Sequence, residues 1–229
     1  MQIAIVSALF LCLLLAEPCS AEQAALSGQI VLPAMGVDKK RTFKRDYRRR
    51  SRRQETAGVA QSDPHKSPYR DVVISAHPRS FEASASPLPQ PVTVEQFGVA
   101  FVPRVIPITV GTTLEFINQD HIYHNVFSLT PGAKFDIGRK PTGIIERRNI
   151  DKVGVVQLFC DIHPQMSAVV LSLDTPYFSQ VDREGKYAIG DLPSGTYEVR
   201  VYHPDLGGLS EVVELQTDQQ LVRDFLLGN

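Results

Sequence analysis

The chain has 229 residues, of which 43% are hydrophobic and 21% are charged, and its formal net charge is -1. Domains typically hold about 100–150 residues, so the chain can form one large domain or two small ones. The composition is globular, which excludes fibrous and wholly disordered proteins. Its 16 Pro and 15 Gly are scattered among segments rich in β-branched and aromatic residues. This pattern favours many short strands joined by turns.

The N-terminal residues 1–21 have the pattern of an export signal. Residues 3–16 form an apolar segment that is short for a transmembrane helix, and the small residues Cys19 and Ala21 suit signal peptidase. No Lys or Arg precedes the apolar segment, which is atypical, so an uncleaved anchor is the alternative. We expect a cleaved signal peptide, a periplasmic or secreted protein, and no transmembrane domain in the mature chain.

Cleavage of this signal would leave Cys160 as the only cysteine of the mature chain, because Cys12 and Cys19 lie within residues 1–21. Such a thiol cannot form an internal disulfide. In an oxidising compartment an unpaired thiol is a liability unless it is buried, reactive or bound to a metal. A lone cysteine is most often a small buried hydrophobe, so the residues around Cys160 decide its interpretation.

A strongly basic run follows the first expected strand, which covers residues 26–33. Residues 39–53 contain ten Lys or Arg and one acid, Asp46, so their charge is +9 and the rest of the chain sums to -10. Like charges repel and little apolar surface offsets the cost of ordering, so a flexible loop is expected. The functional alternative is a patch for an anionic partner, such as an acidic redox protein or a lipid surface. Nucleic acid is not expected as a partner of an exported protein.

Short β-forming segments continue along the rest of the chain. Their number and regular spacing indicate an all-β protein, a sandwich or barrel with antiparallel or Greek-key pairing. A second all-β unit begins near Pro176, with a hairpin over 181–189 and a strand over 195–201 that buries one face. The strands expected before it cover residues 71–76, 92–101, 106–110, 113–118, 125–129, 143–150, 155–159 and 168–173.

Residue types that bind soft metals follow the strand expected at 155–159. Cys160 ends this apolar run, and His163 and Met166 follow at offsets of three and six. A tight loop can fold such offsets around one ion, and Pro164 would stiffen that loop. A thiolate and two imidazoles with a long axial thioether are the ligand set of a blue-copper electron-transfer site.

The second imidazole has a candidate upstream. His124 lies between a turn at 118–120 and the strand expected at 125–129. Asn125 is a candidate for a hydrogen bond that links the two ligand-bearing segments. His121 is a further candidate ligand, although a loop histidine that faces solvent is the simpler interpretation. His65, His77 and His203 are assigned no role.

Other interpretations of these residues are open. The simplest is a buried thiol beside an ordinary polar turn. A cysteine hydrolase would use Cys160 as nucleophile and a histidine as base, but it lacks an evident orienting partner and gives Met166 no purpose. The chain contains no Gly-x-Ser-x-Gly elbow, phosphate loop or His-Glu-x-x-His motif, so we do not expect an enzyme. The stronger alternatives are non-redox copper binding or delivery and a degenerate interaction module.

The sequence Cys-x-x-His-Pro-x-Met after a strand, with His-Asn-Val upstream, resembles the cupredoxins, and its short spacing is most similar to amicyanin. Together with residues 101–105 and 110–113, it resembles the plastocyanin-type, methylamine utilisation protein-like secreted proteins of bacteria over residues 92–173. The resemblance implies a cupredoxin Greek-key β-sandwich that transfers single electrons. It also implies that the ligands of one type 1 copper ion are His124, Cys160, His163 and Met166.

The segments on either side resemble a different family, the carboxypeptidase regulatory-like domain, which is a small transthyretin-like β-sandwich. The motifs are Asp182-x-x-Gly185-x-Tyr187 and the segment 192–197. The resemblance implies that the cupredoxin unit is inserted into one such sandwich. The expected organisation is a signal peptide at 1–21, regulatory-like parts at 26–91 and 174–229, and a cupredoxin domain at 92–173.

A redox partner protein follows from an electron-transfer function. A ligand on the closing loop lies nearest to solvent, so we expect electrons to pass through the edge of His163, with Pro164 and Met166 forming an apolar docking patch. An acidic partner would also contact the basic run at 39–53, which departs from the regulatory-like pattern.

Overall fold

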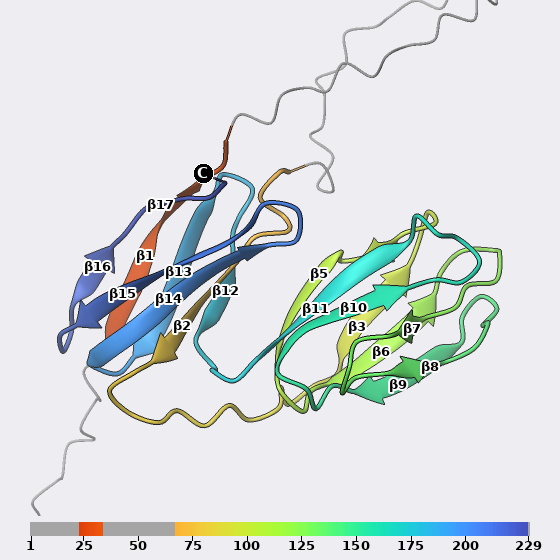
Figure 1. Ribbon diagram of the computed structural model, residues 1–229, viewed down its shortest axis with the longest axis horizontal. Helices are drawn as coiled ribbons and strands as arrows, with labels where there is room; N and C mark the ends of the chain where they lie inside the picture. Colours follow the sequence, from red (N-terminus) through yellow and green to blue (C-terminus); the bar gives the residue numbers. More distant parts are fainter. Residues whose placement is uncertain (1–22, 34–66, 229) are drawn as a thin grey trace, which may run out of the picture.

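The structure is a computed structural model that describes residues 23–33 and 67–228. The signal peptide expected at 1–21, the basic run at 39–53 and His65 lie outside these residues. The described part of the chain forms strands β1 to β17 and no helix, so the expected all-β class is confirmed. It therefore offers no helix long and apolar enough to cross a membrane. Figure 1 shows two groups of strands beside each other.

We call the strands formed by the two ends of the described chain the flanking unit. They make two sheets around one core, whose largest fully buried side chain is Tyr197. The first sheet has the order β13-β1-β16, with β17 also paired to β1. It comprises β1 (Ala24–Val31), β13 (Lys186–Leu192), β16 (Gln220–Val222) and β17 (Phe225–Leu226). The second comprises, in spatial order, β12 (Phe178–Gln180), β2 (Val73–Pro78), β14 (Gly195–His203) and β15 (Gly207–Leu215).

The hairpin expected over residues 181–189 is wrong. A turn does form there, because the Gly185 N–H donates to the Asp182 carbonyl at 3.2 Å. However, β12 pairs with β2 in one sheet, and β13 pairs with β1 in the other. Both Val181 and Tyr187 are buried in the core between these sheets. The turn therefore carries the chain across the core, and its turn chemistry alone could not distinguish this crossing from a hairpin.

The remaining strands form the central unit, a sandwich of two mixed sheets around a second core. The chain passes through β5 in one sheet between β3 and β6 in the other, and this crossover allows β3 and β6 to pair in parallel. The first sheet comprises, in spatial order, β5 (Val105–Thr109), β11 (Ser167–Leu173), β10 (Gly154–Phe159), β7 (Phe127–Ser128) and β8 (Phe135–Asp136). The second comprises β4 (Phe101–Val102), β3 (Val92–Gln96), β6 (Thr113–Asn118) and β9 (Ile145–Asn149).

The long strand expected at 92–101 is interrupted. It ends at Gln96, and a turn closed by hydrogen bonds between Phe97 and Ala100 follows it. Gly98 and Val99 have φ angles of 62° and 58°, which lie in the left-handed region and break the strand. The backbone N–H groups of this turn point toward the candidate metal site described below.

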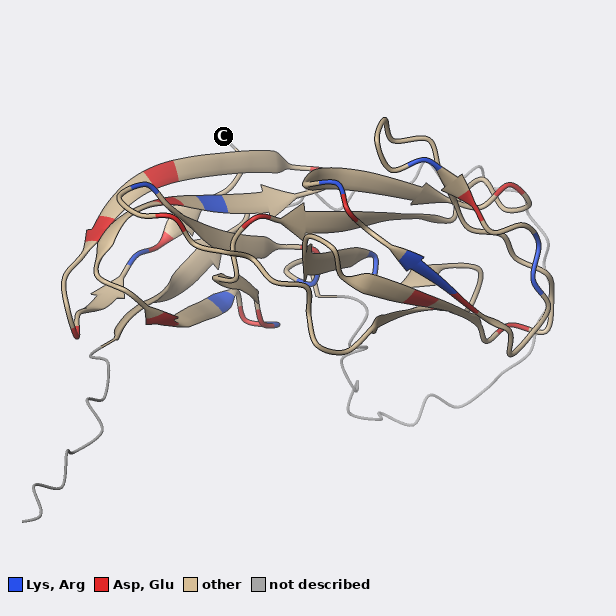
Figure 2. Cartoon of the chain, turned by 90° about the horizontal axis from the view of Figure 1, so that it is seen from below, with Lys and Arg blue, Asp and Glu red and all other residues tan. Residues whose placement is uncertain are grey.

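The two units contact each other through a small apolar core and an ion-pair cluster. Arg104 of the central unit donates to Asp71 at 2.8 Å and to both carboxylate oxygens of Asp205 at 2.7 and 2.8 Å. Both acids belong to the flanking unit. Figure 2 shows other charged residues spread over both units. The apolar contact comprises Val73, Val105, Leu171 and Leu173, with Phe178 and Tyr202 packed against them.

Candidate metal centre

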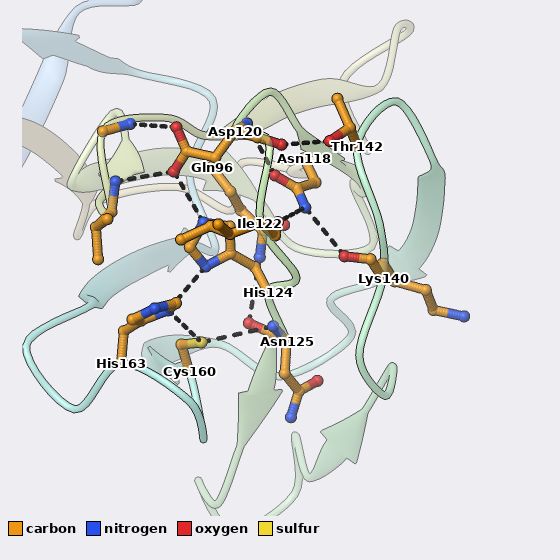
Figure 3. Close-up of polar contacts among 12 residues, drawn as sticks. Gln96, Asn118, Asp120, Ile122, His124, Asn125, Lys140, Thr142, Cys160 and His163 are labelled. Atoms are coloured by element: carbon orange, nitrogen blue, oxygen red, sulfur yellow. Dashed lines mark hydrogen bonds and ion pairs between the residues drawn. The ribbon is translucent and has the colours of Figure 1, made fainter.

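Three side chains of the central unit converge at one end of its core. One ligand atom from each of His124, Cys160 and His163 lies within 4.8 Å of the other two. The two Nδ1 atoms of the histidines are 3.1 Å apart, and Cys160 Sγ is 3.9 Å from His163 Nδ1. Figure 3 shows both imidazoles and the thiol turned toward one point. The structure thus brings together three of the four predicted ligands from two segments of the chain.

The loop between β10 and β11 positions Cys160 and His163. These two strands form an antiparallel pair, and Phe159 lies opposite Ser167 at the end where the loop joins them. The Cys160 N–H donates to the Met166 carbonyl at 3.3 Å, and the Met166 N–H donates to the His163 carbonyl at 2.9 Å. These hydrogen bonds close the loop. They explain how side chains three and six positions after Cys160 come to lie on one side of it.

A second segment holds His124 in place. Its backbone exchanges two hydrogen bonds with Lys140, and the side-chain amide of Asn118 donates to the carbonyls of Ile122 and Lys140. The imidazole of His124 is fully buried. Because the backbone is anchored on both sides, the ring has little freedom to move, as a preorganised ligand requires.

Asp120 determines which nitrogen of His124 faces the cluster. The carboxylate lies 2.8 Å from His124 Nε2 and also accepts the N–H groups of Gly98 and Val99 at 2.8 and 2.9 Å. Burial raises the pKa of Asp120, but these backbone bonds and the bond to His124 outweigh it and hold the pKa below its usual value. An ionised Asp120 accepts a proton from Nε2, so it is Nδ1 of His124 that faces Cys160 and His163.

The thiol of Cys160 also accepts a hydrogen bond from the backbone. The backbone N–H of Asn125 donates to Sγ at 3.5 Å, and Gln96 donates to the Asn125 carbonyl at 3.2 Å. Asn125 thus links the segment of His124 to the loop of Cys160 through its backbone. Its side-chain Oδ1 is buried without a hydrogen-bond partner among the described residues.

The remaining predicted residues are placed as follows. Met166 is 1% exposed and belongs to the same apolar cluster as Cys160. The expectation that Met166 forms part of an exposed docking patch is therefore wrong, because the loop turns its side chain into the core. His163 is partly exposed, and His121 is exposed in the turn before His124.

Sequence reasoning missed two features around the site. The first is Asp120, whose position four residues before His124 at the end of a turn was the available signal. The second is a group of apolar side chains at the surface near the site, namely Phe97, Ile122 and Tyr123, which are 60%, 46% and 59% exposed. Phe97 lines a cavity together with Gln165 and Met166 of the loop between β10 and β11.

Comparison with known proteins finds no matching family model and no matching curated protein. Among solved structures, a copper-containing nitrite reductase from Thermus scotoductus SA-01 is 30% identical over 42% of this chain, with a TM-score of 0.36. The aligned part spans 25% of the nitrite reductase chain. A purple cupredoxin from Nitrosopumilus maritimus is 22% identical over 36% of this chain and 99% of its own, with a TM-score of 0.33. A reduced amicyanin mutant is 17% identical over 44% and 98%, with a TM-score of 0.35.

Proposed function

We propose that the central unit binds one type 1 copper ion and that the protein transfers single electrons. The ligands would be Nδ1 of His124, Sγ of Cys160 and Nδ1 of His163, with the Met166 thioether as the axial ligand. The observation that carries the proposal is the convergence of two imidazoles and a thiol within 4.8 Å at a buried position. A thiolate and two imidazoles form the trigonal donor set of blue-copper sites.

The arrangement of the ring nitrogens fits a cation between these groups. His124 Nε2 lies against Asp120, and its Nδ1 is 3.1 Å from the Nδ1 of His163. Two nitrogen lone pairs at this distance repel unless a cation lies between them. A metal ion at this point would use both lone pairs, and the Asp120 carboxylate would increase the basicity of His124.

Copper would supply a one-electron couple, and the chain supplies a rigid environment for it. His124 is anchored to Lys140 and Asp120, and Cys160 is held by backbone bonds to Asn125 and Met166. Ligands that are fixed by the fold move little when the charge of the ion changes. The apolar core around Cys160 also limits the access of water to the site.

The proposed route to a redox partner leads through His163. This ring is partly exposed, and the apolar side chains of Phe97, Ile122 and Tyr123 lie at the same end of the unit. Such a patch suits a transient docking contact. We further propose export by the signal at 1–21 and an acidic partner that also contacts the basic run at 39–53. The likeness of the flanking unit to regulatory-like domains stays a prediction that depends on its motifs.

Copper titration of matched variants tests the proposal. The protein without its signal should bind one equivalent of cupric ion and develop the intense colour of a thiolate–copper band. Cys160→Ser should lose this band, and His124→Ala should lose tight binding. His121→Ala is the matched control and should behave like the parent protein, because His121 is exposed and outside the cluster. Retention of the band by Cys160→Ser, or no binding by the parent protein, would refute the assignment.

A reductive titration separates electron transfer from copper storage. An electron carrier should lose its colour when reduced and regain it when oxidised, with the copper retained in both states. A delivery protein should hold cuprous ion without colour and release it to a chelator. A protein that binds no copper would exclude both functions and leave the alternatives that need no metal, such as a degenerate interaction module.

A further inference from the structure

The outer face of the second flanking sheet carries polar side chains where the two units meet. Along β2, Ile74 and Ala76 point into the flanking core, so the period of two places Ser75 and His77 on the opposite face. Ser75 lies opposite Arg200 of β14 in the ladder, and His77 lies opposite Glu198. Ser75 and His77 are both buried.

A cavity of about 440 Å³ lies between this face and the central unit. Its size is that of sites for small organic ligands. Polar side chains of the flanking unit line this cavity together with apolar side chains of both units. The polar members include Ser75, His77, Asp174 and Arg200, and the apolar members include Leu171 and Leu209.

Ser75, His77 and Asp174 form a continuous hydrogen-bonded chain. The hydroxyl of Ser75 lies 3.0 Å from His77 Nε2, and the opposite ring nitrogen, Nδ1, lies 2.9 Å from a carboxylate oxygen of Asp174. Asp174 comes from the short connection between β11 and β12, so it is contributed from outside β2. The Asp174 carboxylate accepts the proton on His77 Nδ1, which leaves Nε2 to accept the hydroxyl proton.

We propose that this cavity is an acyl-transfer site for small carboxylic esters, with Ser75 as nucleophile, His77 as general base and Asp174 as the residue that positions His77. The nitrogen assignment is the one this chemistry requires, because the base must contact the nucleophile through one nitrogen and its orienting acid through the other. The proposal is independent of the copper site, which uses other residues at the far end of the central core.

The reaction balances with water as the only co-reactant. Ser75 Oγ attacks the ester carbonyl carbon while His77 Nε2 takes the hydroxyl proton. The C–O bond to the alcohol then breaks, and His77 returns the proton to the leaving oxygen. Water hydrolyses the acyl-serine by the same two steps. Arg200 lies opposite Ser75 in the ladder, lines the same cavity and donates one N–H to Glu198. A guanidinium in this cavity would stabilise the negative charge that develops on the carbonyl oxygen.

The charges around His77 support a neutral base. Burial lowers the pKa of His77 and Arg200 lowers it further, while Asp174 and Glu198 act in the opposite direction and the net shift is downward. Imidazole that is neutral at pH 7 can accept a proton from Ser75. The rate should therefore rise with pH through the lowered pKa of His77 and reach its plateau by neutral pH.

A fluorophosphonate probe, with mass spectrometry of the labelled peptide, tests the site on the full chain. Attack of Ser75 Oγ on phosphorus would expel fluoride and leave a stable adduct. We expect the adduct on Ser75 and no labelling in Ser75→Ala. Ser210→Ala is the matched control, because this serine lines the same cavity and is exposed, and it should label like the parent. His77→Gln should label at least about 100-fold more slowly.

Hydrolysis of p-nitrophenyl butyrate gives the readout for Asp174. Because Asp174 raises the pKa of His77, Asp174→Asn should lower the maximal rate and move the acid limb of the pH profile to lower pH. A merely structural residue would leave that limb unchanged. Circular dichroism of each variant identifies loss of the fold. Absence of an adduct on Ser75 in the folded parent protein, or undiminished labelling of His77→Gln, would overturn the proposal.

Discussion

Two buried histidines of this protein each bind an aspartate, yet they offer opposite nitrogens to their surroundings. In the central unit Asp120 occupies Nε2 of His124, which leaves Nδ1 to face a thiol and a second imidazole. At the boundary between the units, Asp174 occupies Nδ1 of His77, which leaves Nε2 to face a hydroxyl. The carboxylate selects the free nitrogen, and the group opposite that nitrogen decides whether a metal ion or a proton suits the site.

The largest expected effect comes from removing each carboxylate in turn. Asp120→Asn should weaken copper binding by about 10–100-fold, because it removes the acceptor that fixes His124. Labelling of Ser75 should be unaffected, and Asp174→Asn should give the reverse pattern. Isothermal titration with copper and probe labelling measure the two outcomes. Asp161→Asn is the matched control, since this exposed acid lies beside Cys160 and pairs with Arg139. If Asp120→Asn bound copper like Asp161→Asn, the role assigned to Asp120 would be wrong.

A smaller effect is expected at the contact that holds the two units together. Arg104→Met removes a bidentate bond to Asp205 and leaves the buried carboxylate of Asp71 with one fewer donor. We expect a loss of about 1–3 kcal/mol in the free energy of unfolding. Arg139→Met removes an exposed pair and should cost at most about 1 kcal/mol. Chemical denaturation compares the two variants, and equal losses would contradict the role of Arg104.

The smallest effect is a pH dependence of stability that arises from buried neutral histidines. Burial lowers the pKa of His77 and of His203, whose Nδ1 accepts the N–H groups of Asp205 and Leu206. Between the folded pKa and the ordinary value the unfolded chain binds more protons, so stability rises with pH in this window and falls as pH decreases through it. Denaturation midpoints between pH 5 and pH 7.5 should show the trend (roughly the range in which histidine titrates). His203→Gln should weaken it, and an unchanged slope would contradict this explanation.

The expected elements were predicted best where the period of hydrophobic residues is regular. Strand 113–118 and the strand that leads into Cys160 lie close to their expected limits, because alternating burial leaves a clear pattern. The strand expected at 92–101 is interrupted, because Gly98 and Val99 adopt positive φ angles. No local sequence pattern predicts these angles. The hairpin expected at 181–189 does not form, because the pairing of a strand depends on strands that are distant in the sequence.

The residues of the two sites also differ in whether a local pattern or only the tertiary fold brings them together. Four candidate ligands could be chosen from residue types and spacing, and the structure groups three of them, His124, Cys160 and His163. Two of these three meet because one loop carries both Cys160 and His163. Asp174, in contrast, follows His77 by nearly one hundred residues along the chain, roughly the length of one domain. The whole central unit lies between them in the sequence. The sequence alone indicates no role for His77, because only the tertiary fold brings these residues together.

The central claim is that the cluster of His124, Cys160 and His163 forms a copper–thiolate site. The most direct test is the visible absorption spectrum of the protein, expressed without residues 1–21 and loaded with one equivalent of cupric ion. We predict an intense blue band that disappears on reduction and returns on oxidation. A pale spectrum like that of cupric ion bound only by nitrogen and oxygen would contradict the claim.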